Sequence, residues 1–150
     1  STMNRLAAEE ALVETALFYN RNKRADFDKN VSGCSYQTSK KKRSKKCAVA
    51  RLMTPDAIET VVNNGMNGLD ITTVVSTLRL SNDKLLQPKW KSLSLDFMAD
   101  LQQLHDAKGN WDLYGITDRG MEKVRSMCMK FGLDCEGVVR KINMERKTPS

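Results

Sequence analysis

Four cysteines and a single histidine are the residues of this sequence best suited to catalysis or metal binding. His105 is followed by Asp106, and a carboxylate beside an imidazole can orient the ring for nucleophilic catalysis with a thiol such as that of Cys34 or Cys47. However, nothing near these cysteines in the sequence indicates an activated thiol, and the chain has no further histidine for a metal-dependent hydrolase site. We therefore predict that the protein is not an enzyme, and that His105 is a hydrogen-bonded helix residue.

The cysteine spacing does not match a zinc-binding motif. Cys34 and Cys47 are 13 positions apart and Cys128 and Cys135 are 7 apart, whereas zinc ribbons and fingers use pairs about two to four residues apart. Cys34, Cys47 and His105 remain weak candidates for a metal site that only the tertiary fold could assemble, and we expect neither metal nor cofactor. A Cys34–Cys47 disulfide is a further alternative. No secretory signal is evident, so we expect a reducing cytoplasm in which thiols persist.

The positive charge is concentrated in one segment. The 150 residues carry a formal net charge of +7. Residues 21–51 contain eleven Lys or Arg and two Asp, a net +9, so the other 119 residues sum to −2. Six of the seven residues from 40 to 46 are cations. Such runs recur in surfaces that bind nucleic acid. We predict polyanion binding by Arg21, Lys23, Arg24, Lys40, Lys41, Lys42, Arg43, Lys45 and Lys46.

The surrounding elements are predicted to be helices. Apolar spacing and capping residues favour helices over about 3–20, 54–63, 71–79, 94–109, 117–131 and 134–142, with 21–33 and 81–92 as loops. The expected N-terminal caps are Thr54, Asp70, Ser94, Thr117 and Asp134, and Gly132 is expected to end a helix. Two short segments flank the basic run, one beginning at Cys34 and one at Cys47. They predict a small β-hairpin over about 34–50 with a cationic tip.

The expected fold class is therefore mainly α: a single domain of five or six helices with one small hairpin, spanning 1–150. Ser1-Thr2 before Met3 is expected to be a cloning remnant, and 145–150 a frayed tail. No apolar stretch reaches the roughly 18 residues of a membrane span, so no membrane partner is expected. The sequence does not indicate an oligomeric state.

A second pattern involves the same cysteines. Cys34-x-Tyr36, a polar turn, Cys47-Ala48-Val49 and Leu101-Gln102-x-Leu104-His105-Asp106 resemble a loose group of small uncharacterised proteins of phages and their bacterial hosts. Those proteins follow the pattern C-x-Y, turn, C-A-V-G, then L-Q-x-[IL]-H-D. This sequence departs from it at Ala50, where the group has Gly, and its turn is more basic. The resemblance implies a phage-type accessory protein in the bacterial cytoplasm. It also implies that Cys34, Tyr36, Cys47, His105 and Asp106 cluster as a packing knot or a small site.

Two functions follow from these patterns. The first is a non-enzymatic accessory protein that engages nucleic acid, or a host protein that handles nucleic acid, through the cationic hairpin. The second is an inhibitor or adaptor of a host enzyme that docks by an apolar helical face, with the basic segment guiding it to an acidic partner. A metal-supported Cys/His site is the third, less favoured alternative.

Overall fold

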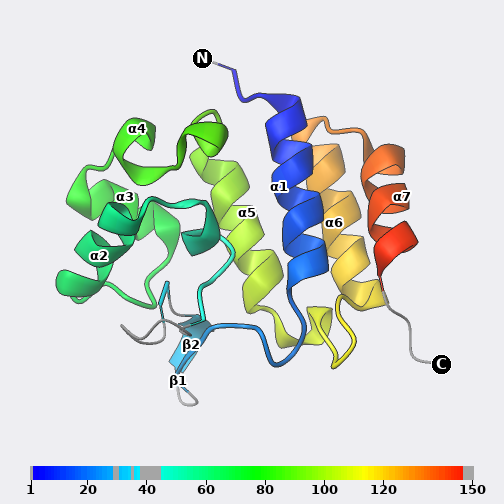
Figure 1. Ribbon diagram of the computed structural model, residues 1–150, viewed down its shortest axis with the longest axis horizontal. Helices are drawn as coiled ribbons and strands as arrows, with labels where there is room; N and C mark the ends of the chain where they lie inside the picture. Colours follow the sequence, from blue (N-terminus) through cyan, green and yellow to red (C-terminus); the bar gives the residue numbers. More distant parts are fainter. Residues whose placement is uncertain (1, 29–30, 35, 38–44, 147–150) are drawn as a thin grey trace.

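The computed structural model describes residues 2–28, 31–34, 36–37 and 45–146, and Figure 1 shows its arrangement. The chain is mainly helical, as predicted. In the described part there are three 3-10 turns, η1 (Ala50–Leu52), η2 (Pro88–Trp90) and η3 (Lys108–Asn110). There are also seven α-helices, α1 (Arg5–Phe18), α2 (Pro55–Asn63), α3 (Ile71–Leu78), α4 (Asn82–Leu85), α5 (Leu95–Asp106), α6 (Asp118–Phe131) and α7 (Cys135–Glu145). The additional helix, α4, lies in the predicted 81–92 loop.

The predicted helix starts are confirmed. In each case the capping side chain accepts a hydrogen bond from the amide three residues further on, which satisfies a donor that has no partner within the helix. Gly132 ends α6 with φ of 65°, a left-handed conformation that glycine adopts without strain. The residues that cap α2, α3, α5, α6 and α7 in this way are Thr54, Asp70, Ser94, Thr117 and Asp134.

The helices are arranged around α1 and α5. Figure 1 shows α1, α5, α6 and α7 side by side, with α2, α3 and α4 gathered beyond α5. α1 contacts α5 and α7, α6 contacts α5 and α7, and α3 contacts α5. A continuous apolar core connects these elements, and its largest fully buried side chains include Trp111, Tyr19, Tyr36 and Phe97. In this view a two-stranded sheet lies below the helices, to the left of the lower end of α5.

The predicted hairpin over about 34–50 is not seen in the described residues, and residues 35 and 38–44 of it lie outside them. The antiparallel pair is β1 (Asp26–Asp28) with β2 (Val31–Cys34), so it lies in the segment 21–33 that was predicted to be a loop. After the basic run, residues 48–52 form a turn and η1, and Met53 forms an isolated antiparallel β-bridge with Leu86. Their amides bond locally, with Arg51 N donating to Cys47 O at 3.2 Å, while Thr54 N donates to Leu85 O at 3.0 Å. A short apolar run cannot be assigned to a strand by its composition alone, and here it packs as an irregular buried segment.

The C-terminal segment continues further in regular structure than predicted. α7 extends through Glu145, and Arg146 Nη2 donates to Asp118 Oδ1 at 2.8 Å. Residues 147–150 of the expected frayed tail lie outside the described residues.

Candidate functional site

His105 is held from both ring nitrogens inside the fold. It lies in α5 and is fully buried. Ala25 N donates to Nε2 at 3.2 Å, and Nδ1 lies 2.9 Å from Asp106 Oδ1. Because a backbone amide can only donate, Nε2 accepts and the proton sits on Nδ1, facing the carboxylate. Both ring nitrogens therefore have partners within the protein. Their contacts hold residues 24–25 against α5.

Arg24 lies on the same buried end of α5. Its side chain is only 4% exposed, and it donates from Nε to His105 O at 2.7 Å and from Nη2 to Asp106 O at 2.5 Å. Trp111 Nε1 also donates to His105 O, at 3.1 Å. The last carbonyls of a helix lack intrahelical partners and carry partial negative charge, so a guanidinium stabilises them. Arg24 thus caps α5 from the interior and is not part of the exposed cationic surface.

Tyr36 and Cys47 pack in the same interior region, and both side chains are fully buried. Burial, and then the nearby Cys47, raise the pKa of Tyr36 above its usual range. Burial is also the main cause that raises the pKa of the Cys47 thiol to about 12, and the Asp106 carboxylate adds to it. The Tyr36 hydroxyl lies near Gln102 without hydrogen-bond geometry to it. An inert protonated thiol and phenol are expected of a packing cluster.

The structure therefore brings Tyr36, Cys47, His105 and Asp106 into one region around the C-terminal half of α5. Cys34 ends β2, opposite Asp26, and its side chain lies outside what the structure describes. In the described part of the chain, no three His, Cys, Asp or Glu side chains are arranged to hold a metal ion. The region has the features of a buried packing knot, with Asp106 alone partly exposed.

This cluster predicts alkaline destabilisation. The Cys47 thiol has an ordinary pKa of 9.0 when exposed in the unfolded chain and about 12 in the folded protein. Above about pH 9 the unfolded state binds fewer protons than the folded state, so stability falls as pH rises, by up to about 1.4 kcal/mol per pH unit for one thiol. Urea unfolding of the wild type and of Cys47→Ala between about pH 8 and about pH 10.5 tests this. The variant should lose stability less steeply. If the free energy of unfolding falls with pH equally steeply in both proteins, Cys47 is not the group responsible.

The exposed Lys23 and the half-buried Arg51 lie against a different residue, Phe18, at the end of α1. The Arg51 guanidinium lies 3.8 Å from the centre of the Phe18 ring, and Lys23 Nζ lies 5.2 Å from it. Phe18 is 40% exposed. Tyr19 Oη donates to Lys46 O at 2.6 Å, which ties the end of the basic run to the same helix end. We call Phe18, Lys23, Lys46 and Arg51 the Phe18 edge.

The predicted cationic residues thus have different positions. Arg21, Lys23, Lys45 and Lys46 are exposed, whereas Arg24 is buried. Lys40, Lys41, Lys42 and Arg43 lie outside the described residues. The positive charge of the Phe18 edge meets negative charge in one direction, because Phe18 and Arg51 also line a groove that contains four acids of α1 and α7, Glu9, Glu10, Glu14 and Glu145.

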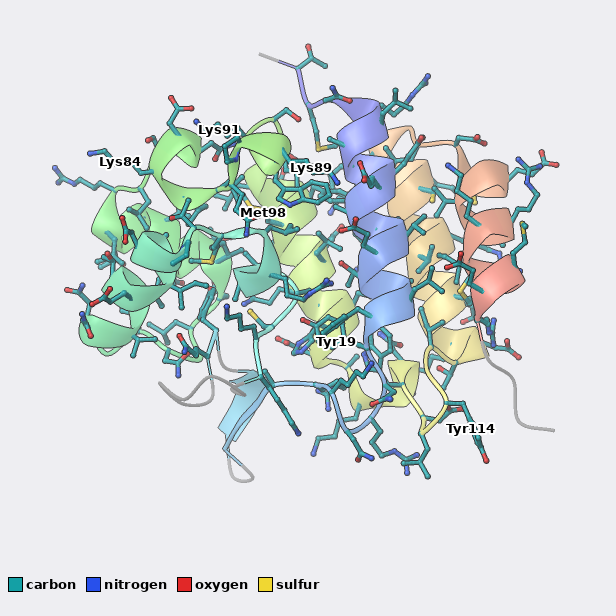
Figure 2. All side chains as sticks on the ribbon, viewed as in Figure 1. Tyr19, Lys84, Lys89, Lys91, Met98 and Tyr114 are labelled. Atoms are coloured by element: carbon teal, nitrogen blue, oxygen red, sulfur yellow. The ribbon has the colours of Figure 1, made fainter. Side chains whose placement is uncertain are left out.

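Sequence reasoning missed Phe18, Arg51 and Tyr114. Arg51 was counted in the basic segment but not assigned to the site. The buried stripe of α1 is formed by Ala8, Ala11, Leu12, Thr15 and Ala16. Phe18 lies at the edge of this stripe, seven residues after Ala11, so the spacing alone does not mark it as exposed. Figure 2 shows Tyr114 projecting from the loop below α6, at the same end of the molecule as Tyr19. Its placement near Phe18 depends on the tertiary structure.

Comparisons with protein-family models, with curated proteins and with solved structures find no match to this chain. Within the described residues, no helix has both the length and the apolar character needed to cross a membrane.

Proposed function

We propose that this protein is a non-enzymatic, phage-type accessory protein that binds nucleic acid through residues 40–46 and the adjoining Phe18 edge. The observation that carries the proposal is the local charge: the +9 segment of the sequence begins and ends at the Phe18 edge. Phosphate groups are neutralised by such clustered Lys and Arg, with release of counterions. The exposed Arg21, Lys23, Lys45 and Lys46 extend the same surface.

The shape of the charged surface suggests contact at one end of the molecule. The described part of the cationic segment begins at the lower end of α1 in Figure 1 and includes the two-stranded sheet, and the other 119 residues are nearly neutral. The acidic groove between α1 and α7 would repel phosphates and so limit the contact. A protein of this kind meets the polyanion by one edge and does not wrap it.

Removal of the central cations tests the proposal. In a variant with Lys41, Lys42, Arg43 and Lys45 all replaced by Ser, affinity for DNA or RNA should fall by about 10- to 100-fold at low salt. The slope of log K against log salt should become shallower by roughly 3–4, since each lost phosphate contact contributes about 0.9. Fluorescence anisotropy at about 50 and about 200 mM salt measures both quantities. An unchanged affinity and slope would refute the proposal.

A matched control removes cations from the other end of the molecule. Lys84, Lys89 and Lys91 lie far from the β1–β2 sheet in Figure 2, and their replacement by Ser should reduce the affinity much less for each charge removed. If the control reduces affinity per charge as strongly as the four-residue variant, binding depends on net charge only and not on this segment.

A second function is favoured by a groove that adjoins the Phe18 edge, since Phe18 and Arg51 also line it. The groove of about 690 Å³ between α1 and α7 contains the apolar side chains Leu6, Val13 and Leu17, and Leu6 is 73% exposed. An inhibitor or adaptor of a host enzyme would use such a face. Pulldown from bacterial lysate with and without nuclease separates the two functions. A partner that survives nuclease treatment and is lost with Leu6→Glu favours the adaptor.

A further inference from the structure

A small pocket lies between Phe18 and Tyr114 at the cationic end of the molecule. Its volume is about 150 Å³, which suits one flat ring rather than a drug-sized ligand. Phe18, Asn20 and Lys23 line one part of it, and Tyr114 and Gly115 line another. Glu145 and Arg146 from the end of α7 complete the lining. The pocket shares Phe18 and Lys23 with the Phe18 edge, so it is continuous with the cationic surface.

The turn that presents Tyr114 is well ordered. Asp112 Oδ1 accepts hydrogen bonds from Tyr114 N at 2.8 Å and from Gly115 N at 3.0 Å, and Asp112 N donates to Gly115 O at 2.8 Å. Gly115 has φ of 143°, a conformation that side chains rarely adopt. Asp112 O accepts from Arg21 N at 2.8 Å, which fastens the turn to the loop after α1. The backbone that carries Tyr114 is therefore held in place before binding, which reduces the conformational entropy lost on binding.

The exposure of Tyr114 needs an explanation. The residue is 54% exposed, and among the described residues no aromatic ring or cation packs on its ring. Aromatic side chains beside a cationic groove are the platforms on which proteins stack unpaired bases. Lys23, which lies over Phe18, is exposed and can move from the ring to a phosphate.

We propose that this pocket accepts one unstacked base, so that the protein prefers single-stranded nucleic acid to a duplex. The base stacks on Tyr114, and Lys23 contacts the adjoining phosphate. A paired base within a duplex cannot enter, because its two faces are covered by its neighbours. This inference rests on the proposed function, since the cations of residues 21–51 bring the strand to the pocket.

Replacement of Tyr114 by Ala tests the pocket. Affinity for a short labelled single strand should fall by about one to two orders of magnitude, the range typical of one lost base stack. Affinity for the corresponding duplex and the salt slope should not change, since no cation is removed. The wild type should bind a strand of abasic sugars as weakly as Tyr114→Ala binds the intact strand. The affinity of Tyr114→Ala should be the same for the abasic strand as for the intact strand.

Leu113→Ala is the matched control, because Leu113 is 56% exposed on the same turn and does not line the pocket. It should leave both affinities unchanged, and circular dichroism should show the same helix content in all variants. If Tyr114→Ala binds the intact single strand like the wild type, the pocket inference is overturned, while loss of binding in the four-residue Ser variant still supports the proposed function. If the wild type binds neither strand nor duplex, the proposed function and this inference both fail.

Discussion

Replacement of Arg24 by Ala should lower the free energy of unfolding by about 3–5 kcal/mol, and replacement of the adjacent Lys23 by Ala should change it by less than about 0.5 kcal/mol. Both residues are cations of the same loop. Arg24 is buried and donates to the carbonyls of His105 and Asp106, whereas Lys23 is exposed. Without the guanidinium, two charge-assisted hydrogen bonds are lost at the buried end of α5, and the loop that carries Ala25 loses its anchor.

The same pair of variants separates packing from binding. Under conditions in which both variants are folded, Lys23→Ala should weaken binding to nucleic acid and reduce the salt slope by up to about 1, while Arg24→Ala should leave the slope unchanged. Urea unfolding gives the stabilities and anisotropy gives the slopes. If Arg24→Ala has wild-type stability but a reduced slope, Arg24 belongs to the cationic surface and the interior role is wrong.

Gly120→Ala should destabilise the protein by roughly 2–3 kcal/mol, although Ala is the better helix former. Gly120 lies in the first turn of α6, and a Cβ there would be 2.7 Å from Asn110 O and 2.5 Å from Ile116 Cγ1. Asn110 O cannot move away easily, because it accepts a hydrogen bond from Thr117 N at 2.8 Å. The substitution must therefore shift the backbone around η3 or the side chain of Ile116, which is 3% exposed.

Gly137→Ala provides the control, because Gly137 has the equivalent position in α7. Both glycines donate their amide to the capping residue, Thr117 for Gly120 and Asp134 for Gly137. At Gly137 the added Cβ would meet only the Asp134 side chain, which can rotate, so the loss should stay within about 1 kcal/mol. Thermal or urea unfolding compares the two. Equal losses would show that the glycine is needed for the cap and not for the close approach to Asn110.

The Gly120 contact also bears on the pocket. Trp111 and Ile116 form an isolated β-bridge that closes the turn carrying Tyr114. Movement of Asn110 or Ile116 in Gly120→Ala would displace that turn. We therefore expect this variant to bind single strands more weakly than the wild type, even at temperatures at which it is fully folded.

The helix starts could be predicted from the sequence because capping is local. The side chain of a cap such as Thr54, Asp70 or Thr117 accepts a hydrogen bond from an amide three residues away. The residues that form the cap are therefore close together in the sequence and can be recognised from it. The hairpin could not be placed in this way. Residues 47–53 looked like one strand of a pair, but their packing partner is the segment 85–87, and Gln87 N donates to Leu52 O at 3.0 Å. Whether a short apolar run becomes a strand depends on the neighbour that its backbone meets.

The sequence by itself determined the helical class, the helix starts and the concentration of positive charge in residues 21–51. Tertiary structure alone decided which of those charges face solvent. Arg24 and Lys23 are adjacent cations, but only Arg24 is buried, because it donates to the carbonyls at the end of α5, more than eighty residues away, which have no partner within the helix. Likewise, Phe18, Arg51 and Tyr114 share a surface only because α1 ends beside both η1 and the turn after η3. Whether such a residue is exposed depends on the hydrogen bonds that distant backbone groups can form with it. The local sequence does not show which backbone groups these are.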